Sequence, residues 1–165
     1  VVGTYDGGGR PNVMTVAWTS PISLHPPLLI IAVHPSRYTH DMLKRSEECV
    51  LNIPARPLAE QVIKCGRLSG REVDKIKQLN LRLESGRRIE APWVEGCLAH
   101  LECRVVDILA PGDHTVFIVE VVGGWAEEEA FGQMWIAPQD NDELQPLCHL
   151  GGEQFSLVGK KITAP

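Results

Sequence analysis

The stretch 98–122 constrains the fold of this chain more than any other part of the sequence. Two interleaved sets of residues alternate along its first half: Ala99, Leu101, Cys103 and Val105 against Leu98, His100, Glu102 and Arg104. This period of two predicts a half-buried β-strand. The turn Ala110-Pro111-Gly112-Asp113 follows, and the run His114–Val122 returns. We therefore expect an antiparallel hairpin here.

A second hairpin is predicted near the start of the chain. The glycine-rich stretch Tyr5–Asn12 separates two extended segments, and glycine supplies the positive φ values that a tight reversal demands. The second arm, Asn12–Trp18, has mostly apolar residues on both of its faces. We expect this strand to be covered on both sides.

The remaining strands and helices are short. The apolar run Leu28–Val33 predicts a buried strand that Pro35 stops, and a helix follows over 41–45. Glu48–Ile53 predicts a further strand, closed by Pro54.

Two more helical segments are expected. Pro57–Lys64 has proline at a first helical position and Gly66 just past the helix end. The capping-box spacing of Ser69 and Glu72 predicts a helical turn through 73–75.

Five or six strands, glycine and proline turns and only short helices favour a closed or half-closed antiparallel barrel over an alternating βαβ fold. The length of 165 residues suits one domain, and we expect it to span 1–165. The sequence shows no internal repeat.

Charge and cysteine content exclude several classes of protein. With 16 basic and 21 acidic side chains the net charge is −5, which argues against a general binder of nucleic acid or of anionic membranes. The five cysteines are odd in number and contain no Cys-x-x-Cys, so neither a disulfide framework nor a zinc knuckle is expected. Reduced thiols, no membrane-spanning run and no signal peptide predict a cytoplasmic protein. The chain does not begin with Met, and we expect residues upstream of Val1.

Residues 36–39, Ser-Arg-Tyr-Thr, lie where the predicted strand 28–33 gives way to a helix. The first amides of a helix lack internal acceptors and carry the positive end of its dipole, so an anion binds favourably there. Arg37 adds a fork of donors. A helix cap with a surface arginine explains the same string equally well.

The histidines allow several interpretations. His114 follows a turn, where it can donate to a bound ring or supply a proton, or simply stabilise the hairpin. The spacing of His34, His40 and His149 fits no common ligand pattern, so no metal site is expected.

Three strings in succession resemble the flavin reductase-like family of FMN-binding split barrels, which includes flavoredoxin and archaeal ferric reductases. They are Asn12-x-Met14-Thr15-x-x-Trp18, Ser23-Leu24-x-Pro26-Pro27-Leu28 and Pro35-Ser36-Arg37-Tyr38-Thr39-His40. Asn52, Cys65-Gly66-x-x-Ser69-Gly70-x-x-x-Asp74-Lys75, Gly112-Asp113-His114-Thr115 and His149-Leu150-Gly151-Gly152 extend the match over nearly the whole chain.

The resemblance implies a mainly β fold, a six-stranded antiparallel Greek-key split barrel with short flanking helices. It implies a homodimer that holds FMN noncovalently near the subunit interface. Ser36, Arg37 and Thr39 would bind the phosphate, and the segment 14–18 would lie along the isoalloxazine. The full set assigned to the cofactor is Asn12, Met14, Thr15, Val16, Ala17, Trp18, Ser36, Arg37, Tyr38, Thr39, Asn52, Ser69, Gly70, Asp74 and Lys75. From the residues alone, core packing explains Met14 and Trp18 as well.

The sequence departs from the family pattern in three places. Ile76 follows Asp74-Lys75 where an aromatic residue is common, and Cys148 precedes His149 where a tyrosine is common. The opening strand is also short. The first two departures affect the cofactor or substrate pocket.

The function that the resemblance implies is transfer of electrons from NADH or NADPH through FMN to free flavin, ferric complexes or another acceptor, with His114 as the candidate catalytic residue. The alternative is a flavoredoxin-like electron carrier that exchanges electrons with a redox protein and has no NAD(P)H activity of its own. A barrel that has lost flavin and serves as a ligand or interaction module is a third reading. Chemistry like that of pyridoxamine-phosphate oxidase is a fourth.

Overall fold

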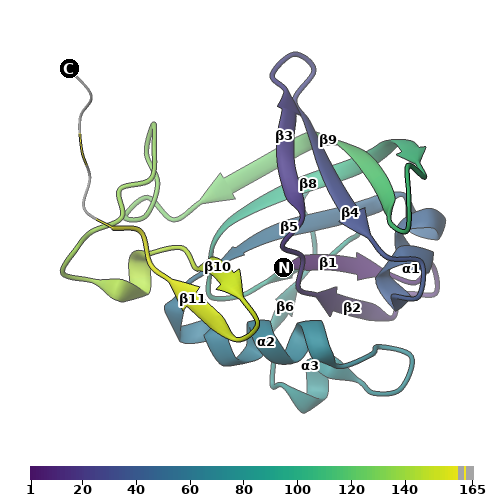
Figure 1. Cartoon of the computed structure of the whole chain (residues 1–165), viewed down its shortest axis with the longest axis horizontal. Coiled ribbons are helices and arrows are strands. Elements are labelled where there is room, and N and C mark those ends of the chain that lie inside the picture. Colours follow the sequence, from purple (N-terminus) through teal and green to yellow (C-terminus); the bar gives the residue numbers. More distant parts are fainter. Residues whose placement is uncertain (160–161, 163–165) are drawn as a thin grey trace.

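The computed structural model describes residues 1–159 and 162, which form a strongly bent antiparallel sheet flanked by short helices (Figure 1). The main sheet has seven strands: β1 (Val2–Tyr5), β2 (Pro11–Met14), β3 (Thr19–Ser23), β4 (Leu28–Val33), β5 (Glu48–Pro54), β8 (Cys97–Leu109) and β9 (Thr115–Ala126). Their order across the sheet is β2-β1-β5-β8-β9-β4-β3. The expected antiparallel barrel is confirmed, with seven strands in its main sheet instead of six.

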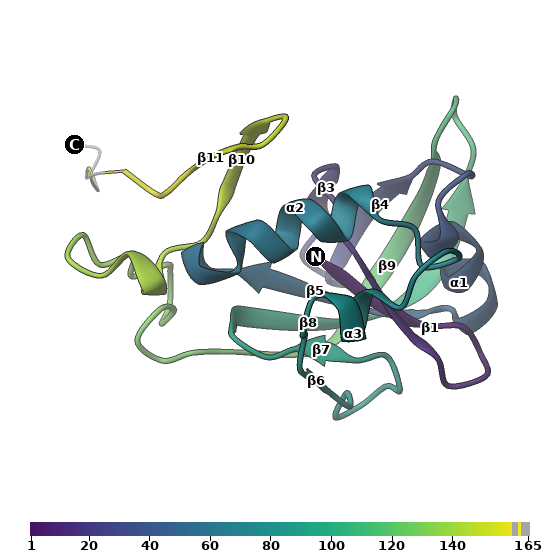
Figure 2. The ribbon, with the colours of Figure 1, turned by 90° about the horizontal axis from the view of Figure 1, so that it is seen from below.

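Helices and two small sheets complete the described chain. They are α1 (Tyr38–Ser46), η1 (Arg56–Leu58), α2 (Ala59–Arg67), α3 (Lys75–Gln78), η2 (Asp142–Leu144), the pair β6 (Leu83–Glu84) and β7 (Trp93–Val94), and the hairpin of β10 (Cys148–Gly151) and β11 (Gln154–Ser156). Figure 2 shows α2 running along the sheet, with β10 and β11 beside it. The longest helices, α1 and α2, have nine residues each, too few to cross a bilayer.

One apolar core explains why the sheet bends. Met14 of β2, Ile31 of β4 and Phe117 of β9 belong to the same buried cluster, although β2 is the first strand in the order and β4 the last but one. A second cluster, which includes Val13 and Cys65, fills the space between the sheet and α2. The expectation that the second arm is covered on both sides is therefore confirmed for Val13 and Met14, but it is wrong for Ala17 and Trp18, which are exposed.

The predicted strand 12–18 is shorter than expected, and this break accounts for the seventh strand. β2 ends at Met14 and β3 begins at Thr19. The amide of Thr19 donates to the carbonyl of Ala17 at 3.2 Å, and the hydroxyl of Thr15 donates to the carbonyl of Val62 on α2. The chain therefore leaves β1 and crosses to pair with β4. We call residues 15–18 the strap.

The helix predicted over 57–64 is displaced along the chain. Pro57 lies in the 3-10 turn η1, and α2 continues through Gly66 to Arg67. Gly66 is part of α2 and lies against the strap, where an added Cβ would come within 3.3 Å of Thr15 Cβ. The predicted helical turn at 73–75 also starts late, because Asp74 caps α3 by accepting from the amide of Lys77.

The strand β8 is not half-buried in the way the alternation predicts. His100 and Glu102, expected on the solvent side, are 2% and 1% exposed. The segment 84–92 folds over this face, and the amides of Arg87 and Arg88 donate to the Glu102 carboxylate. Nδ1 of His100 lies 2.8 Å from Oδ1 of Asn52, so the polar groups on this face are paired.

Candidate functional site

The turn between β4 and α1 is built as the sequence predicts. Arg37 occupies the N-cap position of α1 with extended backbone angles (φ −78°, ψ 135°), and Ser36 and Arg37 are exposed. Nδ1 of His34 lies 2.8 Å from Ser36 Oγ and accepts from the Ser36 amide at 3.1 Å. The first amides of α1 and the two side chains before it therefore face solvent together, ready for an anion.

Thr39 is turned inward. It is 1% exposed, and its hydroxyl accepts from Nδ2 of Asn12 at 2.8 Å. The other side-chain atom of that amide, Oδ1 of Asn12, is buried without a partner among the described residues. Gly70 lies against Oδ1 so closely that a Cβ at Gly70 would come within 2.4 Å of it. Glycine is required at this position because the loop 68–74 passes directly over Asn12.

Arg71 ties that loop to the start of α1. Its guanidinium donates to the carbonyl of Ser36 at 2.7 Å and to the carboxylate of Asp41 at 2.5 Å, and it lies 5.4 Å from the ring centroid of Tyr38. The same bond to Arg71 lowers the pKa of Asp41. Sequence reasoning did not assign Arg71 to the site, since it looks like one more member of a basic surface stretch.

Lys75 is the most unusual charged residue of the site. It is 4% exposed, and its ammonium donates at 2.8 Å to the carbonyls of Val13 and of Cys65. An ammonium has three donors, so one remains for a ligand. The pKa of Lys75 is lowered to about 8, mainly by burial, and the positive charge of Arg37 contributes in the same direction.

These groups surround a hollow of about 250 Å³, which we call the loop cavity. Its lining comprises Met14, Ser36, Arg37, Tyr38, Thr39, Gly66, Leu68, Ser69, Gly70, Arg71, Glu72 and Lys75. Among the residues that the structure describes, the guanidinium of Arg37 forms no ion pair. Two cations that repel one another across a small cavity favour an anion between them.

A larger hollow of about 460 Å³, the strap cavity, adjoins the first. It is lined by Met14, Thr15, Val16, Ala17, Trp18, Ala32, Val33, His34, Ser36, Arg37, Gly66 and His114. The two cavities share Met14, Ser36, Arg37 and Gly66, so one elongated ligand can occupy both.

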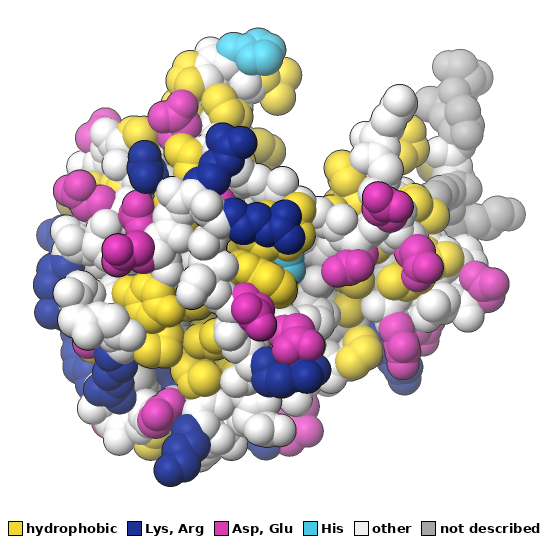
Figure 3. Space-filling view, turned by 180° about the vertical axis from the view of Figure 1, so that it is seen from behind, with side chains coloured by type: hydrophobic (Ala, Val, Ile, Leu, Met, Phe, Trp, Pro, Cys, Tyr) yellow, Lys and Arg dark blue, Asp and Glu magenta, His cyan; other side chains and the backbone are white. Residues whose placement is uncertain are grey.

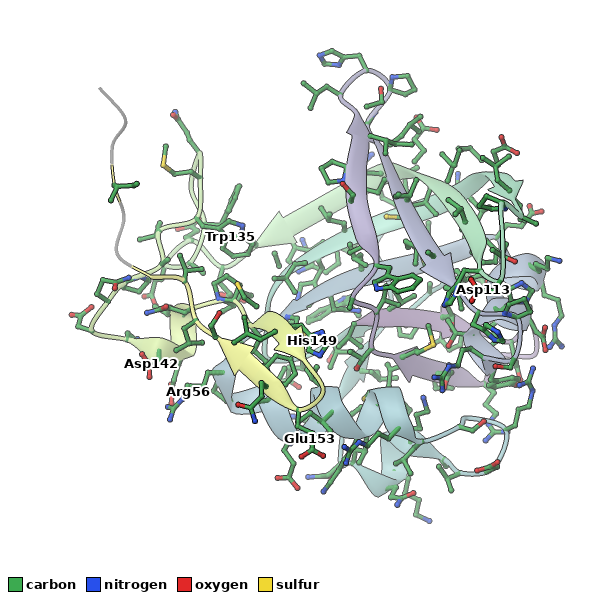
Figure 4. All side chains as sticks on the ribbon, viewed as in Figure 1. Arg56, Asp113, Trp135, Asp142, His149 and Glu153 are labelled. Carbon is green, nitrogen blue, oxygen red and sulfur yellow. The ribbon has the colours of Figure 1, made fainter. Side chains whose placement is uncertain are left out.

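Aromatic side chains stand at the mouth of the strap cavity. The His114 ring lies 4.6 Å from the Trp18 ring and 5.2 Å from the His34 ring, measured between centroids. Nδ1 of His114 lies 2.8 Å from the carboxylate of Asp113, and this bond lowers the pKa of Asp113 (Figure 4). An ionised Asp113 orients the imidazole and leaves Nε2 available to the cavity.

Three of the residues assigned to the cofactor line neither cavity. The Asn52 amide is fully buried and bonded to Val94, His100 and backbone carbonyls of Val1 and Val50. Asp74 caps α3, and Asn12 acts only through Thr39. The residues that sequence reasoning missed are Gly66, Arg71 and His34. In the sequence, Gly66 is typical of the residue that follows a helix. Nothing in the neighbouring sequence indicates that it contacts the strap.

The residues present fit an FMN molecule. The loop cavity offers the guanidinium of Arg37, the ammonium of Lys75, two serine hydroxyls and the start of α1, a donor set suited to a phosphate. Its carboxylate, Glu72, belongs to an exposed residue. The strap cavity offers an apolar slot with backbone groups along one edge, as a flavin ring requires.

Comparison with known proteins agrees with this geometry. Residues 1–157 match the family described as flavin reductase like domain. An uncharacterised protein of Archaeoglobus fulgidus is 41% identical over 116 residues, which cover 70% of this chain and 66% of that protein. A protein of Streptomyces globisporus named NADH-dependent FAD reductase is 32% identical over 119 residues, 70% of this chain and 63% of that protein.

Among solved structures, flavoredoxin from Methanosarcina acetivorans superposes with a TM-score of 0.85 at 26% identity, covering 99% of this chain and 85% of that one. This agreement extends over the bent sheet, the strap and the helices that frame the two cavities. The sequence match, which takes in both the loop after β4 and the segment after α2, and the split-barrel fold lead to one conclusion: the chain belongs to the flavin reductase-like domain family.

Proposed function

We propose that this protein binds FMN and passes electrons from NADH or NADPH to a small acceptor, such as free flavin or a ferric complex. The observation that carries the proposal is the pairing of Arg37 with the buried Lys75 around a cavity that continues into an apolar slot. FMN consists of a phosphate and a planar ring joined by a flexible chain. The phosphate matches the loop cavity, and the ring matches the strap cavity. The name of the Streptomyces relative, NADH-dependent FAD reductase, supports the reductase assignment, and the Methanosarcina protein, a flavoredoxin, supports binding of a flavin.

The residues have distinct roles in this proposal. Arg37, Ser36, Ser69 and Lys75 bind the phosphate, and the strap presents its backbone groups to the polar edge of the ring. Bound FMN would supply hydride acceptance and one- or two-electron chemistry, which no protein side chain provides. Trp18 and His34 limit the access of water at the mouth. His114, oriented by Asp113, holds a proton at Nδ1 and offers Nε2 to the nicotinamide or to the acceptor.

The test is the visible spectrum of the protein loaded with FMN without oxygen, recorded before and after addition of NADH and then of NADPH. Rapid bleaching of bound flavin by one nucleotide supports the reductase and identifies its donor. Failure of the protein to bind FMN contradicts the proposal.

A second candidate function is electron transfer to a protein partner without direct use of NAD(P)H. The exposure of Trp18, 63% at the mouth of the strap cavity, favours it, because a large apolar side chain there is suited to contact with another protein. Flavin that binds but is bleached by neither nucleotide supports this carrier function instead.

The proposal also includes the oligomeric state of the protein and its location in the cell. We place the protein in the cytoplasm as a homodimer, with no nucleic acid or membrane partner. All five cysteines are free, which suits a reducing compartment. The hairpin of β3 and β4 projects from the barrel with exposed apolar side chains, which suits a subunit interface (Figure 3).

A further inference from the structure

The loop 68–74, which lines one side of the loop cavity, is held to the rest of the protein by two arginines. Figure 2 shows the segment between α2 and α3 running beside α1. Arg10 donates to the carbonyl of Gly70 at 3.1 Å, and Arg71 donates to the carbonyl of Ser36 at 2.7 Å. The two serines that we assign to the phosphate, Ser36 and Ser69, therefore lie on separate segments that Arg71 connects.

The charged connection of this loop is to Asp41, in the first turn of α1. The Arg71 guanidinium donates to Oδ2 of Asp41 at 2.5 Å and lies over the Tyr38 ring. A hydrogen bond between two charged groups is roughly twice as strong as one between neutral groups. The five donors of a guanidinium point in fixed directions, which allows Arg71 to contact Ser36 and Asp41 at once. We call the Arg71–Asp41 pair the latch.

The backbone of the loop has no such connection of its own. Between residues 69 and 73, the backbone–backbone hydrogen bonds among the described residues join Glu72 and Val73 to Ser69, within the loop. Side chains therefore hold the loop against α1. Segments with few backbone bonds to their surroundings open at a lower free energy than the sheet beneath them. Loss of one such side-chain bond should thus make the loop open more often.

Asp41 belongs to the latch and not to the proposed phosphate site. It lines neither the loop cavity nor the strap cavity. A carboxylate also repels a phosphate, so direct contact between the two would be unfavourable. Replacement of Asp41 therefore changes the latch without removing a donor from the cavity.

We propose that the latch controls the rate at which FMN enters and leaves the protein. The inference rests on the function proposed above, because it concerns flavin at the same site. The loop 68–74 and the turn 34–37 enclose the phosphate from two sides, so the phosphate passes only when the Arg71–Asp41 pair opens. FMN therefore exchanges slowly and remains bound from one reaction cycle to the next.

The test is stopped-flow quenching of flavin fluorescence, which gives the association and dissociation rate constants of FMN. Asp41→Ala breaks the latch. Both rate constants should rise by at least about threefold and by similar factors, which leaves the dissociation constant within about twofold of the wild type. Loss of a direct contact with FMN would instead raise the dissociation rate and the dissociation constant together. Riboflavin has no phosphate, so its rate constants should stay close to those of the wild type.

Glu60→Ala is the matched control. Glu60 also lies in the first turn of a nine-residue helix, α2, and it forms an exposed ion pair with Lys64 at the same distance of 2.5 Å. It lines neither flavin cavity, so FMN exchange should be unchanged. Arg71→Gln breaks the latch from the other side. Because the two residues form one pair, adding Asp41→Ala to Arg71→Gln should produce little further increase in the dissociation rate.

Hydrogen exchange of the flavin-free protein gives a second measurement, which needs no ligand. The amides of residues 69–73 should exchange faster in Asp41→Ala than in the wild type or in Glu60→Ala. If Asp41→Ala does not fold, Arg71→Gln replaces it in this measurement.

Three results would overturn the latch: an unchanged dissociation rate of FMN in Asp41→Ala, a raised dissociation constant with an unchanged association rate, or unchanged hydrogen exchange of the loop. A wild-type protein that binds no FMN contradicts the proposed function instead. Faster hydrogen exchange of the loop in Asp41→Ala would still support the latch in that case.

Discussion

Arg37 shows how one residue acquires a role from its surroundings. Its position at the N-cap of α1 is evident from sequence, yet the sequence alone explains it equally well as a surface arginine. In the structure it lies beside the loop cavity and close enough to Lys75 to lower the pKa of that lysine. Two cations close together repel one another, which is unfavourable, and an anion bound between them would offset this repulsion.

Replacement of Arg37 by alanine should therefore weaken FMN far more than riboflavin, which lacks the phosphate. A charge-assisted hydrogen bond contributes about 1.5–3 kcal/mol, so the FMN dissociation constant should rise roughly ten- to hundredfold. Quenching of flavin fluorescence measures both constants. Arg45→Ala, an exposed arginine on the same helix, is the control. Equal losses for the two flavins would remove Arg37 from the phosphate site.

Lys75 predicts a pH dependence of FMN binding. Its pKa is about 8 in the free protein, and a bound phosphate raises that pKa because it favours the charged ammonium. Above pH 8 binding must then take up a proton, so affinity should fall by up to about tenfold per pH unit. Between pH 7 and 8 it should change little, since the phosphate is already mostly a dianion.

Titrations from pH 7 to 9.5 test this, with riboflavin as the reference. A pH-independent FMN affinity would contradict contact between Lys75 and the phosphate. The same shift has a consequence for folding without ligand: the ordinary lysine pKa is 10.5, so the unfolded chain holds more protons than the folded one between pH 8 and 10.5. The contribution of Lys75 to the unfolding free energy should accordingly rise with pH in that window.

At the scale of elements, some features are determined by residues that are close in sequence and others by contacts with distant residues. The strand 28–33 and the turn that follows it depend on neighbours in sequence, and their positions are found as predicted. The helix expected over 41–45 is also present, but α1 begins earlier, at Tyr38. The end of β2 depends on a bond from Thr15 to α2, nearly fifty residues away, and sequence reasoning placed it wrongly. The same holds for Glu102, which accepts from backbone amides of the segment 84–92, and for His100, which is paired with Asn52 and packed against the rings of Trp93 and Trp125.

The candidate site divides in the same way. Ser36, Arg37 and the strap residues were assigned through a resemblance that includes their order along the chain. Asn52 belongs to the same pattern, yet its side chain holds strands together instead of lining either flavin cavity. Arg71 was missed because its partners, Ser36 and Asp41, lie thirty or more residues before it.

The segment 84–92 gives a prediction for stability. Both oxygens of the buried Glu102 carboxylate accept backbone amides of this segment. Glu102→Gln replaces one carboxylate oxygen by an amide NH2 group, which cannot accept, and a buried donor left unpaired costs about 1–3 kcal/mol. We expect the free energy of unfolding, measured by urea denaturation, to decrease by this amount, and the affinity for FMN to stay unchanged. Glu84→Gln, exposed in the same part of the chain, should show neither effect. Wild-type stability for Glu102→Gln would refute the anchoring role.

At the scale of the whole molecule, the β3–β4 hairpin projects beyond the barrel that it closes (Figure 1). Ile22 and Leu24 are 49% and 79% exposed on this hairpin, and Trp18 just before it is also exposed. An apolar projection of this kind is unfavourable in water and is a common feature of subunit interfaces. The proposed homodimer would bury it against a second copy of the chain.

Leu24→Asp should therefore shift the protein from dimer to monomer, because a carboxylate would be buried at the interface. Analytical ultracentrifugation measures the mass of each form. Met134→Asp changes another exposed apolar residue, between β9 and β10, and should leave the dimer intact. A monomeric wild type, or a Leu24→Asp protein as dimeric as the wild type, would argue against this hairpin as the interface.

The strap has a thermodynamic consequence that concerns two ligands at once. Thr15, Val16 and Ala17 line both the strap cavity and a second hollow of about 460 Å³ between α2 and the β10–β11 hairpin, so a single stretch of backbone is the common wall of two hollows. Ligands bound in the two hollows would both contact this wall. If one ligand changes the affinity for the other by some factor, the second must change the affinity for the first by the same factor. If flavin binding immobilises the strap, the second ligand no longer has to pay that loss of entropy, and its binding would in turn raise the affinity for flavin by the same factor.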